Sequence, residues 1–221
     1  MTSAILQSIQ VGKVAPLGPD GVPSGFVKHR VDGPIRVTKL GLAGDEQADL
    51  TVHGGFEKAV YAYPAIHHLA WAADYPEHRA LFVAGGVGEN LTIDGWTERD
   101  LCVGDVHAVG TARLQVCQPR QPCATFTLRF NDNRLAKAMV RNGRSGWYYR
   151  VLEEGVISPG NVVELVDRAD TKFGFDRLIE IVNHGDATRS ELDVLVSIPG
   201  LASRLRTKAA RALGESTFQV D

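Results

Sequence analysis

The feature that most constrains the fold is a run of short segments with strand character, separated by turns, that fills the first 168 residues. β-branched residues, or alternation of polar with apolar residues, mark each candidate strand. The candidates are residues 5–11, 34–40, 105–109, 111–116, 147–152 and 161–166. Glycine- and proline-containing turns separate them, as at residues 18–21 and 158–160. Many short strands joined in this way are typical of a barrel or a sandwich, so we expect residues 1–168 to form a mainly β domain.

Helical segments interrupt the β region twice and then follow it. The interruptions lie at about residues 64–73 and 134–141, and further helices are expected at residues 173–182, 189–196 and 201–213. The last of these carries apolar residues four positions apart, at Leu201, Leu205, Ala209 and Leu213. That spacing gives the helix one apolar face. About 50 residues is marginal for independent stability, so we expect residues 169–221 to be a small three-helix module packed on the β domain. The expected fold class is mainly β, with α+β character.

Charge and hydropathy exclude some classes of partner. The chain has 24 basic and 26 acidic residues, a formal net charge of −2, so we expect no long-range attraction to nucleic acid or to an anionic membrane. The N-terminal sequence lacks a basic start followed by an apolar run, and no stretch approaches the roughly 18 apolar residues of a membrane span. We therefore expect a soluble, cytoplasmic protein that binds neither nucleic acid nor membrane.

The cysteines agree with a reducing compartment. The chain has three of them, Cys102, Cys117 and Cys123. An odd number argues against a disulfide framework, and three thiolates cannot complete an ordinary iron–sulfur cluster. The spacing of Cys117 and Cys123 is wider than the two to four positions typical of a zinc knuckle. We therefore expect no iron–sulfur cluster and no zinc, and we interpret Cys102 and Cys117 as core residues.

Cys123 has surroundings that distinguish it from the other two. It ends residues 118–123, a segment that follows a candidate strand and contains two prolines. Proline stiffens a loop, so Cys123 would be presented on a rigid corner. Arg120 lies three positions away, and a nearby guanidinium favours the thiolate, the form that binds metals. The alternative is that Cys123 is a small buried hydrophobic residue, as most free cysteines are.

Two glycine-rich segments are further candidates for ligand contact. Residues 41–55 contain four glycines, His53 and the acidic pair Asp45 and Asp49. His53 could donate to an anion, act as an acid or cap a turn, whereas for the two aspartates we favour hydrogen bonds that stabilise the loop. Residues 85–90 lack the spacing of a dinucleotide fingerprint, although their backbone amides could cradle a phosphate.

An aromatic segment at residues 144–150 has a simpler interpretation. In a strand, Trp147 and Tyr149 would share one face, and Tyr148 and Arg150 the other. Such a pattern alone could suggest stacking on single-stranded nucleic acid. The acidic net charge and the absence of a basic stripe argue against that, so we expect core packing with one partly exposed edge.

In their order and spacing, these motifs resemble the YiiM-like members of the MOSC domain family, named for the C-terminal domain of molybdenum cofactor sulfurases. The matching pieces are residues 25–28, 41–49, 53–55, 88–91, 104–105, 118–123 and 143–152. They span about residues 5–168, and the helical tail also resembles the C-terminal module of YiiM-like proteins. The resemblance implies a MOSC-type β-barrel that binds or handles the molybdenum cofactor, with one central cysteine that corresponds to Cys123.

The resemblance also implies an activity and a set of site residues. YiiM-like proteins are associated with reduction of N-hydroxylated compounds, including 6-N-hydroxylaminopurine. Molybdenum prefers soft sulfur donors, so Cys123 is the expected metal ligand, and Cys123 and His53 are the expected catalytic residues. The expected cofactor-binding residues are Lys28, His53, Gly54, Gly55, Asn90 and Arg120. No flavin fingerprint is present, so we expect electrons from a separate reductase, a flavoprotein, and a small N-hydroxylated substrate.

Two other functions use the same features. Cys123 could carry a persulfide, or hold the cofactor during sulfur transfer, without reducing a substrate. Alternatively, the chain could be a non-enzymatic binding module whose three-helix tail docks a partner. The oligomeric state stays open, and an oligomer is compatible with the sequence.

Overall fold

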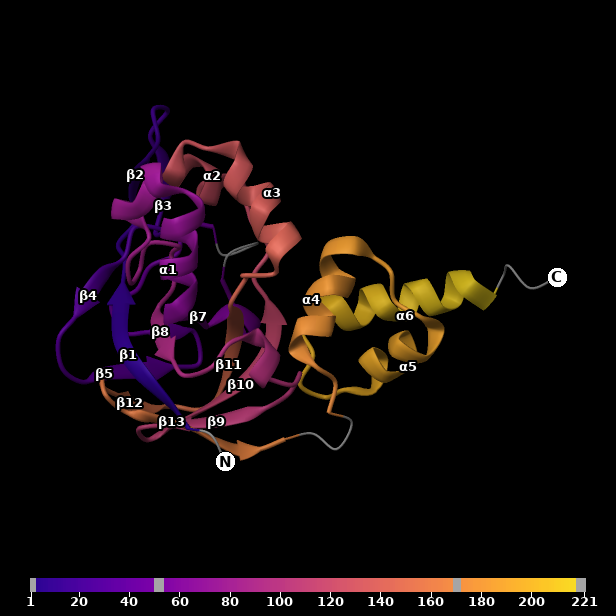
Figure 1. Ribbon diagram of the computed structural model, residues 1–221. Coiled ribbons are helices and arrows are strands. Elements are labelled where there is room, and N and C mark those ends of the chain that lie inside the picture. Colours follow the sequence, from indigo (N-terminus) through magenta and orange to yellow (C-terminus); the bar gives the residue numbers. More distant parts are fainter. Residues whose placement is uncertain (1–2, 50–53, 169–171, 218–221) are drawn as a thin grey trace.

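A closed β-barrel forms the centre of the computed structural model, which describes residues 3–49, 54–168 and 172–217 (Figure 1). Within these residues seven strands pair in the order β13-β9-β10-β11-β7-β8-β1, and β1 pairs back onto β13. A short eighth strand, β4, extends the sheet beside β1, and β7 and β8 are the parallel pair. The bounds are β1 Ala4–Val11, β4 His29–Val31, β7 Val60–Pro64, β8 Leu91–Asp94, β9 Val106–Val109, β10 Ala112–Pro119, β11 Trp147–Glu153 and β13 Val162–Asp167.

Smaller elements surround the barrel. A hairpin and a short sheet with the order β12-β5-β6 lie beside it, and three α-helices and three 3₁₀ turns occur in residues 54–168. The strands are β2 Ala15–Leu17, β3 Val22–Ser24, β5 Ile35–Thr38, β6 Gly41–Leu42 and β12 Gly155–Ile157. The helices are α1 Ala65–Asp74, α2 Ala124–Phe130 and α3 Asn133–Asn142, and the turns are η1 Phe56–Lys58, η2 Pro76–Leu81 and η3 Glu98–Asp100.

The mainly β class and the barrel expected from the sequence are confirmed. All six predicted strands are present, as β1, β5, β9, β10, β11 and β13, and both predicted helices of the β region are present, as α1 and α3. The expectation of only two helices there was wrong, because α2 follows Cys123 directly. Two barrel strands, β7 and β8, were also missed. Every residue of β7 is buried, so this strand lacks the alternation that marks a half-exposed strand.

Apolar side chains pack in two clusters on the two sides of the barrel wall. One includes the side chains of the barrel interior, such as Leu6, Val116, Trp147 and Tyr149. The other lies outside, between the wall and helices α1–α3, and includes Trp71, Phe126, Phe130 and Leu135. In β11, Trp147 and Tyr149 are fully buried, whereas Tyr148 between them is partly exposed and packs with the outer cluster. The predicted alternation of this strand is thereby confirmed, and Tyr148 faces away from the barrel core.

The C-terminal segment forms the expected three helices, α4 Phe175–His184, α5 Arg189–Ser197 and α6 Ser203–Thr217, grouped beside the barrel (Figure 1). Their buried apolar residues, such as Leu178 and Leu192, belong to the same cluster as the barrel interior. The predicted packing of the helices on the barrel is therefore confirmed, while the division into two domains at residue 168 stays a prediction. Among the described residues, no helix has both the length and the apolar character that crossing a bilayer requires.

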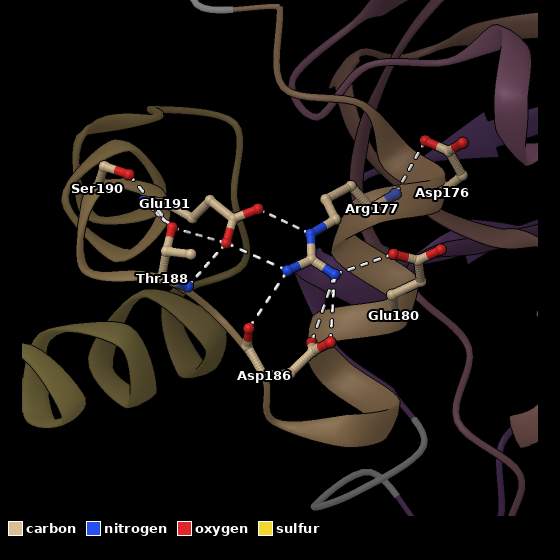
Figure 2. A network of polar contacts seen from close by, with 7 residues as sticks. All are labelled: Asp176, Arg177, Glu180, Asp186, Thr188, Ser190 and Glu191. Atoms are coloured by element: carbon tan, nitrogen blue, oxygen red, sulfur yellow. Dashed lines mark hydrogen bonds and ion pairs between the residues drawn. The ribbon is translucent and has the colours of Figure 1, made fainter.

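Arg177 ties α4 to the start of α5 (Figure 2). Its Nε donates to Glu191 over 2.7 Å, and its Nη1 atom contacts Glu180 and Asp186. Glu191 also accepts the backbone N–H of Thr188, which completes a capping box for α5. The hydrogen bond from Arg177, followed by those from Thr188, lowers the pKa of Glu191 to about 2. This network fixes the turn that sets how the first two helices of the module lie against each other.

Candidate functional site

The segment that carries Cys123 joins barrel strand β10 to helix α2. The strand ends at Pro119, and Cys123 is the N-cap residue of α2, with extended backbone angles. Cys123 is half-buried and lines two cavities at once, a wide cleft of about 750 Å³ and a smaller cavity of about 220 Å³. Arg120 and Tyr148 also line both. Cys123 is therefore accessible to a ligand, unlike a cysteine enclosed in apolar packing.

Arg120 is held beside the cysteine by aromatic rings. Its guanidinium carbon lies 4.9 Å from the ring centre of Tyr61 and 5.2 Å from that of Phe26, within cation–π range. Nη1 donates to the Val87 carbonyl over 3.3 Å, and Nη2 lies 3.7 Å from Cys123 Sγ. Only 6% of the Arg120 surface is exposed. A buried, oriented positive charge therefore faces the sulfur.

The three cysteines differ in acidity because their surroundings differ. Burial alone would raise the pKa of Cys123, but Arg120 and the polar groups of Thr125 and Phe126 outweigh it and bring the pKa below its usual value. Burial raises the pKa of Cys117 to about 12, and burial with the Asp105 charge raises that of Cys102. Only the Cys123 environment therefore favours the reactive thiolate, and the prediction that Cys102 and Cys117 are core residues is confirmed.

Lys28 reaches the smaller cavity and is paired with Asp45. The Lys28 Nζ to Asp45 Oδ1 distance is 2.5 Å, and the two side chains are 6% and 3% exposed. Burial lowers the pKa of Lys28, while the Asp45 charge opposes that shift. Asp45 also accepts the backbone N–H of Gly12 over 2.7 Å, as expected for a loop-stabilising carboxylate. Lys28, Arg120 and Cys123, which the sequence predicted as site residues, thus line one cavity together.

Asn90 lies next to Asp45 and outside the lining of both cavities. Its Nδ2 donates to Asp45 over 2.9 Å and to the Gln10 carbonyl over 3.2 Å, and its Oδ1 accepts the Tyr61 N–H over 3.1 Å. It is 4% exposed and lines neither cavity at Cys123. Both amide donors are therefore used within the protein. We assign Asn90 the role of orienting Asp45, and its direct contact with a cofactor stays a prediction.

The glycine pair at Gly54 and Gly55 leads into the 3₁₀ turn η1. Gly55 has φ 90°, which favours glycine, and its carbonyl accepts the N–H of Lys58 over 3.0 Å. Neither glycine lines the cavities at Cys123, whereas Lys58 lines the wide cleft. His53 lies outside the described residues, so its part as an acid or cofactor ligand stays a prediction.

Several cavity residues were not identified from the sequence. Tyr148 lines both cavities, and burial raises the pKa of its hydroxyl, which therefore keeps its proton. The alternation in β11 placed Tyr148 opposite the core, and that was the available signal for it. The wide cleft also takes basic residues from two distant elements, namely Lys58 from η1 and Arg204, Lys208 and Arg211 from α6. No local pattern brings these segments together.

A second group of polar residues does not make a convincing metal site. In the described part of the chain, Glu77, His78 and Asp132 are the one group of three whose potential ligand atoms lie within 4.8 Å of one another. Arg134 donates to both carboxylates over 2.6 Å, and His78 Nε2 lies 2.9 Å from Asp132. The acidic groups already have a cationic partner, so we assign no metal there.

Replacement of Arg120 by Met tests the electrostatic role of its guanidinium. Methionine keeps an unbranched apolar chain between the two rings but removes the charge, so we expect the pKa of Cys123 to rise. A rise of about one unit would slow alkylation by iodoacetamide at neutral pH roughly tenfold and move its pH profile upward. Arg36→Met, at an exposed position, is the matched control. If the pH profile of alkylation is the same in Arg120→Met as in the wild type, Arg120 does not lower the pKa of Cys123.

Comparisons with known proteins agree with this architecture. The MOSC domain family model matches residues 49–164. Protein YiiM of Escherichia coli (strain K12) is 45% identical over 150 residues, which are 68% of this chain and 67% of that protein. A Gibberella moniliformis (strain M3125 / FGSC 7600) protein named "Reductase" is 31% identical over 198 residues, 88% of this chain but 35% of that protein. The crystal structure of YiiM from Geobacillus stearothermophilus superposes with a TM-score of 0.80 at 34% identity, covering 95% of this chain and 99% of that one.

Proposed function

The chain belongs to the MOSC domain family, and from this premise we propose that it binds the molybdenum cofactor through Cys123 and reduces N-hydroxylated compounds. The observation that carries the proposal is the contact between Cys123 Sγ and the buried Arg120 guanidinium, 3.7 Å apart where two cavities meet. MOSC domains are associated with this cofactor, and a thiolate is a soft donor of the kind that molybdenum prefers.

The residues around the smaller cavity suit the chemistry of the cofactor. Cys123 offers the sulfur ligand, and Arg120 and Lys28 offer positive charge for a phosphate group. Lys28 keeps a balancing partner in Asp45, so its charge is tolerated while buried. When bound, the cofactor would supply the two-electron redox chemistry of the reduction.

The reduction of an N-hydroxyl group requires protons as well as electrons. An R–NH–OH group takes two electrons and two protons and gives R–NH₂ and water, so the site needs a proton source near the departing oxygen. Tyr148 keeps its proton and lines both cavities, so it is placed to donate a hydrogen bond to that oxygen. His53 stays our candidate for the acid itself.

Electrons would come from a separate protein. The chain has three cysteines, too few for an ordinary iron–sulfur cluster, and two of them are buried. The relative named "Reductase" aligns with this chain over only 35% of its own length. We infer that a reductase, a flavoprotein by our expectation, donates electrons to this protein in trans.

The proposal can be tested without that partner. Protein from a host that makes the cofactor is analysed for molybdenum and assayed with chemically reduced viologen and 6-N-hydroxylaminopurine. We expect an equimolar amount of molybdenum and conversion of the substrate to adenine. Loaded protein that reduces no N-hydroxylated compound would reject the enzymatic proposal. Metal-free protein with a stable additional sulfur on Cys123, detected by mass spectrometry, would instead support a sulfur carrier.

A further inference from the structure

The wide cleft beside Cys123 is lined by a row of basic side chains from α6. Arg204, Lys208 and Arg211 lie four and three positions apart, so they share one face of the helix. All three are exposed, and none is paired with a carboxylate among the described residues. Lys58 and Arg120 add to the lining, which includes no acidic residue. We call Arg204, Lys208 and Arg211 the α6 basic row.

The α6 basic row is fixed relative to Cys123. The Glu57 carboxylate accepts the backbone N–H and the hydroxyl of Ser203, the first residue of α6, over 3.0 and 2.9 Å. Glu57 itself is held by Arg150 over 2.7 Å, and the Ala202 N–H donates to the Cys117 carbonyl over 3.0 Å. These contacts join the start of α6 to η1 and to β10, the strand that leads into the Cys123 segment. The helix therefore forms a wall of the cleft.

Lys58, which also lines the wide cleft, adds a positive charge close to the α6 basic row. Lys58 follows Glu57 directly, just as Arg204 follows Ser203, so the Glu57–Ser203 contact brings the two cations near each other. Burial, and then the charges of Arg204 and Arg120, lower the pKa of Lys58. Positive charges held together in one cleft repel each other, and an anionic ligand would relieve that repulsion.

We propose that the α6 basic row binds the phosphate of a nucleotide, so that the protein acts on N-hydroxylated nucleotides in preference to free bases. This inference rests on the proposed reduction. Arg and Lys form charge-assisted hydrogen bonds with phosphate, and the three side chains of the row are exposed to solvent, so a phosphate that exchanges with solvent can reach them. In the proposed function, the cofactor's own phosphate is held by Lys28 and Arg120, which line the smaller cavity. The substrate phosphate is unchanged in the reaction, which consumes the same two electrons and two protons.

The test compares two substrates and two triple variants. The substrates are 6-N-hydroxylaminopurine and N⁶-hydroxyadenosine 5′-monophosphate, with reduced viologen as the electron donor. The first variant replaces the whole row, as Arg204→Gln, Lys208→Gln and Arg211→Gln. The control makes the same charge change at exposed positions that line neither cavity, as Lys137→Gln, Arg141→Gln and Arg189→Gln.

We expect the wild type to show a lower KM for the nucleotide than for the base. In the row variant, the KM for the nucleotide should rise about tenfold or more with little change in kcat. The KM for the base should stay the same. Added salt should raise the nucleotide KM of the wild type more than that of the row variant. The control variant should behave as the wild type.

Other outcomes separate the ways in which the inference can fail. Equal KM values for base and nucleotide, unchanged in the row variant, would overturn it. Loss of molybdenum from the row variant would show that the row holds the cofactor's phosphate and would overturn the substrate assignment. Failure of the loaded wild type to reduce either compound would remove the proposed function and the substrate assignment together. Calorimetry of adenosine 5′-monophosphate binding tests the phosphate site without requiring activity. Binding that is weaker in the row variant, but not in the control variant, would support the site. Equal affinity in the wild type and the row variant would refute it.

Discussion

Cys123→Ala is expected to abolish the reduction of N-hydroxylated compounds by protein prepared in a cofactor-producing host. Replacement of residues that merely support a metal ligand costs about 10- to 100-fold in affinity or activity, so loss of the ligand itself should exceed that range. The Arg120 charge cannot compensate, because it stabilises a thiolate that is no longer present. Viologen-coupled assays measure the loss of activity, and metal analysis of the same preparation measures the loss of bound molybdenum.

The matched control for this variant is Cys102→Ala. Cys102 is buried, lines neither cavity at Cys123 and has a raised pKa, so its thiol should take no part in cofactor binding. We expect Cys102→Ala to keep both molybdenum and activity, with at most a modest loss of stability. Cys123→Ala protein that retains full turnover would exclude this cysteine from the mechanism.

Asp45→Ala is expected to give the largest loss of stability among single substitutions near the site. Asp45 is the buried partner of Lys28, and it also accepts hydrogen bonds from Gly12 and Asn90. Its removal leaves a buried ammonium group without a counter-charge, which typically costs about 3–5 kcal/mol. Urea unfolding followed by circular dichroism measures the change in the free energy of unfolding.

Two further variants identify the cause of that loss. Removing both charges, in Asp45→Ala with Lys28→Met, should recover part of the lost stability, because the unpaired ammonium group is gone. Lys13→Ala breaks the exposed pair with Glu46 and should leave the unfolding midpoint nearly unchanged. If Asp45→Ala unfolds at the wild-type urea concentration, the Lys28–Asp45 pair does not hold this wall of the cavity.

The sequence predicted those parts of the fold whose signal is local. The alternation in residues 147–152 identified β11 and placed Trp147 and Tyr149 on its inner face. By contrast, β7 is buried along its whole length and α2 has only seven residues, so neither shows a readable periodicity. The resemblance to a family identified the barrel; local periodicity alone left a barrel and a sandwich equally open.

In the candidate site, too, the sequence predicted what lies close together along the chain and missed what only the fold brings together. Cys123 and Arg120 were predictable as a pair because both lie on one proline-containing segment, three positions apart. The α6 basic row was not, because its approach to the cleft depends on the contact between Glu57 and Ser203, which are 146 positions apart. Tertiary contacts of this kind have no signature in composition or spacing. They give the C-terminal helices a place beside Cys123 that the apolar periodicity of α6 did not indicate.

Molybdenum K-edge X-ray absorption of the cofactor-loaded wild type tests the central claim most directly, because it counts the sulfur atoms around the metal. We predict one sulfur more than the pterin dithiolene supplies, and its loss in Cys123→Ser. A wild-type spectrum fitted by the dithiolene sulfurs alone would contradict the assignment of Cys123 as the metal ligand.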